Sequence, residues 1–308
     1  MSSGFHKCTT ITPSCPVEAT IYGYYPSLVA NVFFAAAFGF YMVLNIAFAV
    51  RYRTVSYGIA LILGCMTEVV GYIGRIMMHH NPWSQAGFDI QICCLIIAPA
   101  FMSAGIYLTL KHLTLCFGSE HSRIKPALYT WIFIFFDLFS LVLQGTGGGL
   151  AASGKASNTI DTGNDIMLAG ICFQVVTLSV FALMALDYYL RFRRSKLVLS
   201  PKTETLQHDI KFKLFITALV IAFLSIYIRC VYRIVEMAGG WGNTIMRDET
   251  GFIVLEGAMI LVAVSFLTIF HPGYCFPQLR SHHLNAIDDG PSTYEMVGLK
   301  DWEHMPFE

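Results

Sequence analysis

Charged and amide side chains recur inside long apolar segments of this chain, at spacings that align them on helix faces. One segment contains Glu68, Tyr72 and Arg75, and another contains Asp137 and Gln144. Residues four and seven apart lie on one side of an α-helix, so each set is predicted to project from a single face. Such faces are suited to binding the polar head of an amphiphile, or to joining helices by ion pairs.

Two further apolar segments carry charges of the same kind. One contains Arg229, Arg233 and Glu236, and the last contains Glu256. An ionisable side chain in hydrocarbon is costly unless it is paired or hydrated. Buried ion pairs are poor stabilisers compared with apolar packing. We therefore predict that all four segments line a polar, substrate-binding cavity open toward the outer leaflet, rather than a network that only fixes helix packing.

The amino-acid composition indicates that these segments lie in a membrane. The chain has 308 residues, of which 55% are hydrophobic and 13% are charged, whereas soluble domains carry about 25% charged residues. Lysine plus arginine balance aspartate plus glutamate at 20 each, which argues against a nucleic-acid partner. A membrane-spanning helix needs about 20 apolar residues. Seven such segments predict an all-α, polytopic membrane protein, at approximately 26–50, 54–78, 90–113, 127–150, 166–190, 212–236 and 251–271.

The loops indicate the orientation and the domain organisation. Basic residues concentrate in the loops on one side, which by the positive-inside rule places the N-terminus outside and the C-terminus in the cytosol. We expect an extracellular N-terminal tail over 1–25, a seven-helix transmembrane domain over 26–273 and a disordered cytosolic tail over 274–308. Outside the membrane, Cys8 and Cys15 could form a disulfide, although the sequence alone does not pair them.

Residues that disturb helices mark two places where the bundle is predicted to hinge. Pro99 removes a helical hydrogen bond in the middle of the third segment and is expected to kink it. Gly145, Gly147 and Gly148 lie at the end of the fourth segment. They permit either a close approach between helices or an unwound, hydrated helix end.

Five blocks, in order and spanning roughly residues 20–275, resemble one family, the fungal lipid-translocating exporters or RTA-like proteins, named for resistance to aminocholesterol. The blocks are Glu68-x-x-Gly-Tyr-x-x-Arg75, Ala98-Pro-x-Phe-x-x-Ala104-x-x-Tyr107, Asp137-x-x-Ser-x-x-x-Gln144-Gly-x-Gly-Gly-Gly149, Arg229-x-x-x-Arg233-x-x-Glu236 and His271-Pro-Gly273. The chain departs from the family pattern at Glu256, where many members have aspartate. The resemblance implies seven helices and a link to sphingoid long-chain base export, to phospholipid asymmetry and to resistance against toxic amphiphiles. Some members are linked to haem or porphyrin handling.

The expected function is therefore translocation of an amphiphile with a cationic amine, such as a sphingoid base, with sterol-like and porphyrin-like molecules as further substrate classes. Its head would pass Glu68, Asp137 and Glu256, and the arginines would keep these acids ionised or bind a phosphate. The sequence has no ATP-binding motif, so movement is expected to be downhill, ion-coupled or dependent on a partner. It indicates no cofactor and does not identify any protein partner. The plasma membrane is the expected location, with the vacuole and endoplasmic reticulum as alternatives.

Two other classes of function were weighed. Seven helices with an external N-terminus are also the layout of receptors, so a lipid sensor or a regulator of lipid asymmetry is the alternative. An intramembrane zinc hydrolase would need several histidines facing one another inside the bundle. The ten histidines lie almost entirely in loops, tails and helix ends, so we do not expect an enzyme. His271 is expected to cap the end of the last helix.

Overall fold

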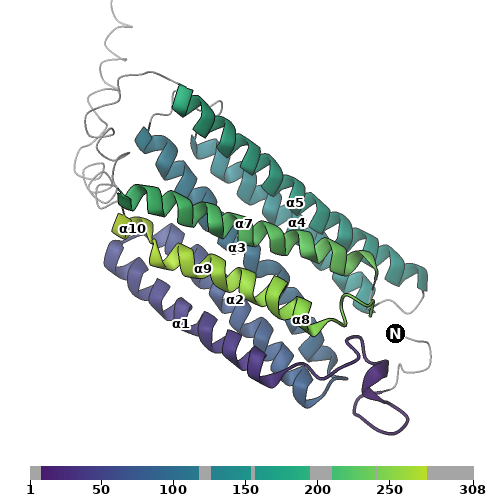
Figure 1. Ribbon diagram of the computed structural model, residues 1–308. Helices are drawn as coiled ribbons and strands as arrows, with labels where there is room; N and C mark the ends of the chain where they lie inside the picture. The colour runs from purple at the N-terminus through teal and green to yellow at the C-terminus, as the bar shows by residue number, and fades with distance from the viewer. Residues whose placement is uncertain (1–7, 118–125, 154–156, 195–209, 241, 276–308) are drawn as a thin grey trace, which may run out of the picture.

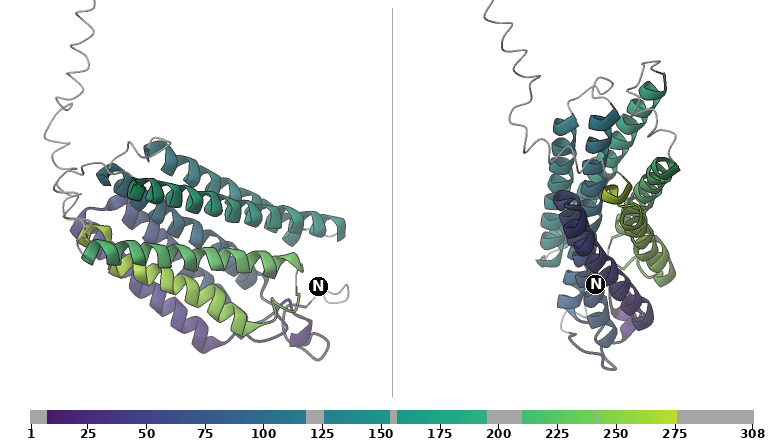
Figure 2. Two further views of the ribbon diagram at one scale, coloured as in Figure 1. Left: turned by 45° about the horizontal axis from the view of Figure 1, so that its top comes forward. Right: turned by 90° about the vertical axis from the view of Figure 1, so that its left-hand side faces the viewer.

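The computed structural model describes residues 8–117, 126–153, 157–194, 210–240 and 242–275. Their long helices run side by side in one elongated bundle (Figure 1), which two further views show from other directions (Figure 2). The helices are α1 (Leu28–Tyr52), α2 (Val55–His80), α3 (Gln85–Phe117), α4 (Pro126–Ser153), α5 (Ser157–Arg194), α7 (Ile210–Ala238), α8 (Glu249–Gly251), η3 (Phe252–Ala258), α9 (Met259–Ile269) and α10 (Pro272–Cys275).

The prediction of seven membrane spans is confirmed. Seven helical stretches are long and apolar enough to cross a bilayer, and they correspond in order to the seven predicted segments. The last of them is composite, because α8, the π-helical segment η3 and α9 follow one another without a break. The orientation of the bundle in the membrane stays a prediction.

The bundle places its apolar side chains outward and many of its polar ones inward. Val29, Trp131 and Leu183 are 81%, 70% and 66% exposed, although all three are large and apolar. Glu68, Arg75 and many other charged or amide side chains are buried. A water-soluble protein could not tolerate this distribution, whereas a bilayer favours apolar side chains on its lipid-facing surface.

Packing joins the helices in neighbouring groups. α2 packs along both α1 and α3, α4 packs along α5, and α7 packs along α9. α3 lies between the groups and contacts α4 and α7 as well. The main apolar core lies among these helices, and a second apolar cluster lies near the end of the bundle where α1 begins. We call this end the N-terminal end.

A short irregular segment precedes α1 and lies against the N-terminal end (Figure 1). It contains one turn of 3-10 helix, η1 (Val17–Ala19). α1 then begins after Ser27, whose hydroxyl accepts a hydrogen bond from the backbone N–H of Ala30. Cys8 and Cys15 form a disulfide, which resolves the pairing that the sequence left open. Most of the cytosolic tail predicted over 274–308 lies outside the described residues.

Of the two alternatives for the glycine-rich stretch, the structure does not have the unwound helix end. α4 continues as a regular helix through Gly145, Gly147 and Gly148 and ends at Ser153. α3 is also one continuous helix around Pro99. Both helices are held by neighbours, so packing compensates for the weak intrinsic helix preference of these residues.

Candidate functional site

The most tightly connected charged group lies where α7, η3 and α3 meet. The guanidinium of Arg229 donates hydrogen bonds through Nη2 to the carboxylate of Glu256 and to the backbone carbonyl of Leu95, each at 2.5 Å. Arg229 and Glu256 are each 2% exposed. Charge-assisted hydrogen bonds are among the stronger polar contacts in proteins. Arg229 thus links three elements that are far apart in the sequence.

Pro99 explains why the carbonyl of Leu95 is available to Arg229. In an α-helix this carbonyl would accept from the N–H of the residue four positions later, and a proline at that position has no N–H. The freed carbonyl is instead satisfied by the side chain of Arg229. Pro99 therefore contributes an acceptor to the charged region without interrupting α3. Its role as a hinge stays a prediction.

The π-helical turn η3 presents Glu256 to the bundle interior. Such turns widen a helix by one residue and occur frequently at functional sites. The next residue, Gly257, has no side chain, and a Cβ placed there would lie 2.7 Å from the Tyr72 hydroxyl and 2.6 Å from the Phe34 ring. The ring of Tyr72 packs against both Phe34 and Phe38, which also pack against each other. Its buried hydroxyl has no hydrogen-bond partner among the described residues.

A second ion pair lies one turn further along α7. Arg233 donates through Nη1 to the carboxylate of Glu236 at 2.5 Å, and the side-chain amide of Asn243 donates to the backbone carbonyl of Glu236. Arg233 and Glu236 are each 1% exposed. The Nε and Nη2 atoms of Arg233 are buried without an acceptor among the described residues. This arginine therefore has unused hydrogen-bonding capacity inside the bundle.

Arg75 of α2 lies at the N-terminal end and is fully buried. Its Nε donates to Asn31 at 3.2 Å and its Nη2 donates to the Tyr24 hydroxyl at 3.1 Å. The nearest carboxylate is that of Glu249, 3.9 Å away. The guanidinium also lies 3.7 Å from the centre of the Phe252 ring, a favourable cation–π geometry.

Glu68 is the buried acid that this network leaves unpaired. It lies seven residues before Arg75 on α2, about 10 Å deeper along the helix axis. It is 2% exposed, and within the described part of the chain its carboxylate has neither a hydrogen bond nor an ion pair. The charges that act on it are those of Glu256, Arg229 and Arg233. We call Glu68, Arg75, Arg229, Arg233, Glu236 and Glu256 the charged cluster.

Asp137 and Gln144 have hydrogen-bond partners of their own on α3 and α5, apart from the charged cluster, and a cavity shared with that cluster stays a prediction. Asp137 accepts a hydrogen bond from Ser103 of α3 at 2.8 Å, and its other carboxylate oxygen is buried without a partner among the described residues. Gln144 donates to Gln174 of α5 at 3.2 Å. The faces were predicted correctly, but α4 turns its polar face toward α3 and α5.

The predicted opening toward solvent is also not a feature of this conformation. Every charged side chain of the cluster is at most 2% exposed, and Asp137 and Gln144 are each 3% exposed. A small pocket at the N-terminal end is lined by other residues, including Tyr22, Trp83 and Phe88. The conformation described is therefore closed around the charged cluster.

The glycines of α4 serve a close approach between helices. A Cβ at Gly147 would lie 2.4 Å from the backbone nitrogen of Met167 and 2.6 Å from the carbonyl oxygen of Gly163, both on α5. A Cβ at Gly148 would make only an ordinary contact with Met167, and one at Gly145 would meet nothing within 4 Å. Of the two alternatives open from the sequence, the structure shows the close approach, and only at Gly147.

Four residues that surround Arg75 were not among the predicted site residues. Asn31, Tyr24 and Glu249 all contact Arg75, and Tyr22 lies under the same guanidinium. Asn31 had a detectable signal, since it is an amide in an apolar segment. The other three lie outside the predicted spans, where polar residues are ordinary.

The opposite end of the bundle holds His271, as expected, at the end of the last helix. Its Nδ1 accepts a hydrogen bond from the backbone N–H of Gly273 at 3.0 Å. A neutral ring therefore carries its proton on Nε2, which lies 3.3 Å from the Thr54 hydroxyl. Burial lowers the pKa of His271 to about 4. Within the described residues, no group of three or more histidine, cysteine, aspartate or glutamate side chains is placed to hold a metal ion.

Comparisons with known proteins agree with the resemblance in the sequence. The sphingoid long-chain base transporter RSB1 of Saccharomyces cerevisiae is 31% identical over 288 aligned residues, which cover 82% of this chain and 74% of that protein. Protoporphyrin uptake protein 1 of the same yeast is 32% identical over 209 residues, covering 66% and 65% of the two chains. Protein RTM1 of Saccharomyces cerevisiae is 32% identical over 217 residues, which cover 70% of this chain and 67% of that protein.

No solved structure matches the chain, so the family assignment depends on sequence. Residues 61–279 match the family described as RTA1 like protein. This range includes every residue of the charged cluster as well as Asp137 and Gln144. The chain belongs to the RTA1-like family.

Proposed function

We propose that this protein translocates amphiphiles with a cationic amine head, and that sphingoid long-chain bases are its principal substrate class. It is a multi-pass membrane protein, and we place it in the plasma membrane with its N-terminus outside. We assign it no catalytic activity, because its relatives are named for transport and uptake. Sterol-like and porphyrin-like molecules remain further candidate substrates.

The observation that carries this proposal is the unpaired carboxylate of Glu68. Within the charged cluster, Arg229 pairs with Glu256 and Arg233 pairs with Glu236. Arg75 is directed toward Glu249 and two tyrosines at the N-terminal end. Glu68 therefore has no cation of its own in a region that is almost inaccessible to water. An isolated buried carboxylate is costly, and it favours either a proton or a cationic ligand.

A sphingoid base supplies the groups that the site lacks. Its ammonium would pair with Glu68, and its hydroxyl groups would accept hydrogen bonds from the unused nitrogens of Arg233. Its hydrocarbon tail would remain among the apolar side chains that the helices present to lipid. Asp137 offers a second unpaired carboxylate, held by Ser103 between α3 and α4. Two such acids in separate places suit a head group that moves in steps.

The test is transport by the purified protein in liposomes. The probe is a sphingoid base labelled at its tail, so that its amine stays free, and the measurement is the protection of the label from an impermeant quencher over time. We expect Glu68→Gln to lower the transport rate about ten- to a hundredfold, the value of one charge-assisted hydrogen bond. Asp137→Asn should lower it as well. Asp165→Asn makes the same chemical change as Asp137→Asn at an exposed position and should leave the rate unchanged.

The same assay separates transport from sensing. An N-acylated probe carries no positive charge, so it should move slowly through the parent protein and respond little to Glu68→Gln. If the parent binds the charged probe but moves neither probe, the protein is a sensor and not a translocator. If Glu68→Gln and Asp137→Asn both transport like the parent, these acids have no part in substrate binding.

A further inference from the structure

The segment before α1 covers the part of the bundle that contains Arg75. Residues 8–27 run across the N-terminal end, next to the turn between α2 and α3 and to the start of the last span (Figure 1). Nearly all of these residues are at least partly exposed, and only Thr20, Tyr22 and Pro26 are buried. Most of the segment therefore lies on the bundle as a cover, and Tyr22 anchors it in the second apolar cluster.

Two tyrosines fasten the middle of this cover to the site. The Tyr22 hydroxyl accepts a hydrogen bond from Gln91 of α3 at 2.8 Å, and the Tyr22 ring packs against Phe88. The Arg75 guanidinium lies 5.3 Å from the centre of the same ring, and its Nη2 donates to the Tyr24 hydroxyl. Arg75, which faces the interior of the bundle, is thus closed off by the cover itself.

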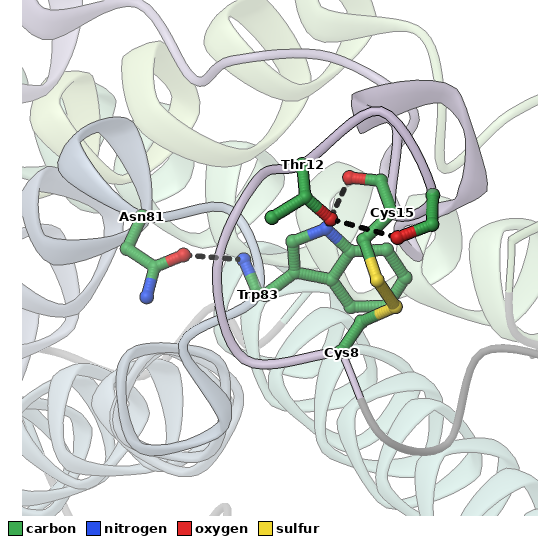
Figure 3. Close-up of a disulfide and its surroundings, with 6 residues drawn as sticks. Cys8, Thr12, Cys15, Asn81 and Trp83 are labelled. Atoms are coloured by element: carbon green, nitrogen blue, oxygen red, sulfur yellow. Dashed lines mark hydrogen bonds between the residues drawn. A yellow bond between two sulfur atoms is a disulfide. The ribbon is translucent and has the colours of Figure 1, made fainter.

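The two ends of the cover are held in different ways. At its start, the loop closed by Cys8 and Cys15 lies against Trp83 (Figure 3), whose indole N–H donates to the carbonyl of Cys15 at 3.3 Å. Asn81 donates to the carbonyl of Thr9 at 2.8 Å. At its end, the backbone N–H of Ser27 donates to Glu249. The middle, between these two attachments, is held by Tyr22 and Tyr24 and by a hydrogen bond between the His79 ring and the carbonyl of Pro26.

We propose that residues 8–27 form a lid whose middle, Tyr22-Gly23-Tyr24, must leave the N-terminal end for an amphiphile to reach the charged cluster from that side. The disulfide loop stays on the turn between α2 and α3 and acts as the fixed end of the lid. Opening of the middle limits the rate of entry. This inference rests on the proposed function, because it names the gate of the same site.

Gly23 allows the lid to be weakened without altering the charged cluster. Its φ is +73°, a left-handed conformation that side chains disfavour. A Cβ there would lie 3.4 Å from the Arg247 side chain, which is an acceptable contact. Gly23→Ala therefore acts through backbone strain, which lowers the population of the closed lid about five- to thirtyfold relative to the open form. Gly240→Ala is the matched control, with φ +72° and no heavy atom within 4 Å.

The experiment combines hydrogen exchange with transport, using the full-length protein in liposomes and the tail-labelled sphingoid base. In Gly23→Ala we expect the amides of residues 20–27 to exchange about five- to thirtyfold faster, and the initial rate for base added on the N-terminal side to rise. Gly240→Ala should change neither quantity. Replacing Cys8 and Cys15 by serine should speed exchange in residues 8–16, because the fixed end is then loosened.

The outcomes distinguish the lid from the proposed function. If the parent moves no base, the proposed function fails. The lid is then judged by hydrogen exchange alone, and equal amide exchange rates in Gly23→Ala and the parent would overturn it. If the parent transports, faster exchange without a faster initial rate in Gly23→Ala shows that the segment is only a mobile cover, which overturns the gate. Equal changes in Gly23→Ala and Gly240→Ala show general destabilisation and also overturn it.

Discussion

The clearest test of the packing in the bundle is the replacement of Gly147 by alanine. The added Cβ would lie 2.4 Å and 2.6 Å from two backbone atoms of α5. Backbone atoms cannot rotate away, so α4 and α5 must separate by roughly an ångström to reach ordinary contact distances near 3.5 Å. Overpacking of this kind costs about 1–3 kcal/mol. We expect the free energy of unfolding, measured in detergent by denaturant titration, to fall by that amount or more.

Gly145→Ala, two residues earlier on α4, provides the matched control. A Cβ there meets no atom within 4 Å, so only the better helix propensity of alanine remains, and the protein should gain up to about 1 kcal/mol. Without the close contact at Gly147, the same substitution at two positions of one helix would be expected to change the free energy of unfolding in the same direction. If Gly147→Ala also stabilises the protein, the close approach of α4 and α5 is wrong, and the glycines serve an unwound helix end after all.

Two further predictions concern the charged cluster and the end of the bundle that holds His271. Arg229→Gln should lower the free energy of unfolding by about 3–5 kcal/mol, because Glu256 is left as a buried charge without its partner. Replacing both Arg229 and Glu256 by methionine should recover much of this loss. If Arg229→Gln is as stable as the parent, the ion pair is contradicted. Burial lowers the pKa of His271 to about 4 from 6.5. Between these pH values the unfolded chain binds one more proton than the folded protein, so the protein loses stability as the pH falls. His271→Gln should remove this part of the pH dependence of the unfolding temperature, and an unchanged pH dependence would contradict the role of His271.

The number of spans and the polar face of each span could be predicted from the sequence, because both follow from the chemistry of a single helix. Apolar length sets the spans, and spacings of three, four and seven set the faces. The polar faces of α2 and α7 both point into the bundle, and the charges of Arg229 and Arg233 act on Glu68. The family assignment was equally available, since its motifs lie in order along the chain.

The partners of each polar face could not be predicted, because they depend on how neighbouring helices are rotated and displaced. The sequence gives no direct information on the rotation of α4, so the partners of Asp137 and Gln144 on α3 and α5 could not be named. The contact between Arg229 and Leu95 depends on a backbone carbonyl, which any residue possesses; only the position of Pro99 four residues later marks it. The lid residues Tyr22 and Tyr24 lie outside the predicted spans, so helix spacing could not predict that they contact Arg75.

The pairing within the charged cluster bears on whether it serves packing or a ligand. A network that only joins helices is satisfied when each charge has a partner, as Arg229 has in Glu256 and Arg233 has in Glu236. Helix packing alone does not explain why Glu68 is buried without a partner in the described structure. It also does not explain why two nitrogens of Arg233 lack acceptors there. Each of these costs free energy in the closed conformation. Replacement of Glu68 by glutamine should therefore stabilise the protein, or leave its stability unchanged, while it slows transport. A large loss of stability in that variant would instead show that Glu68 serves the packing of the bundle.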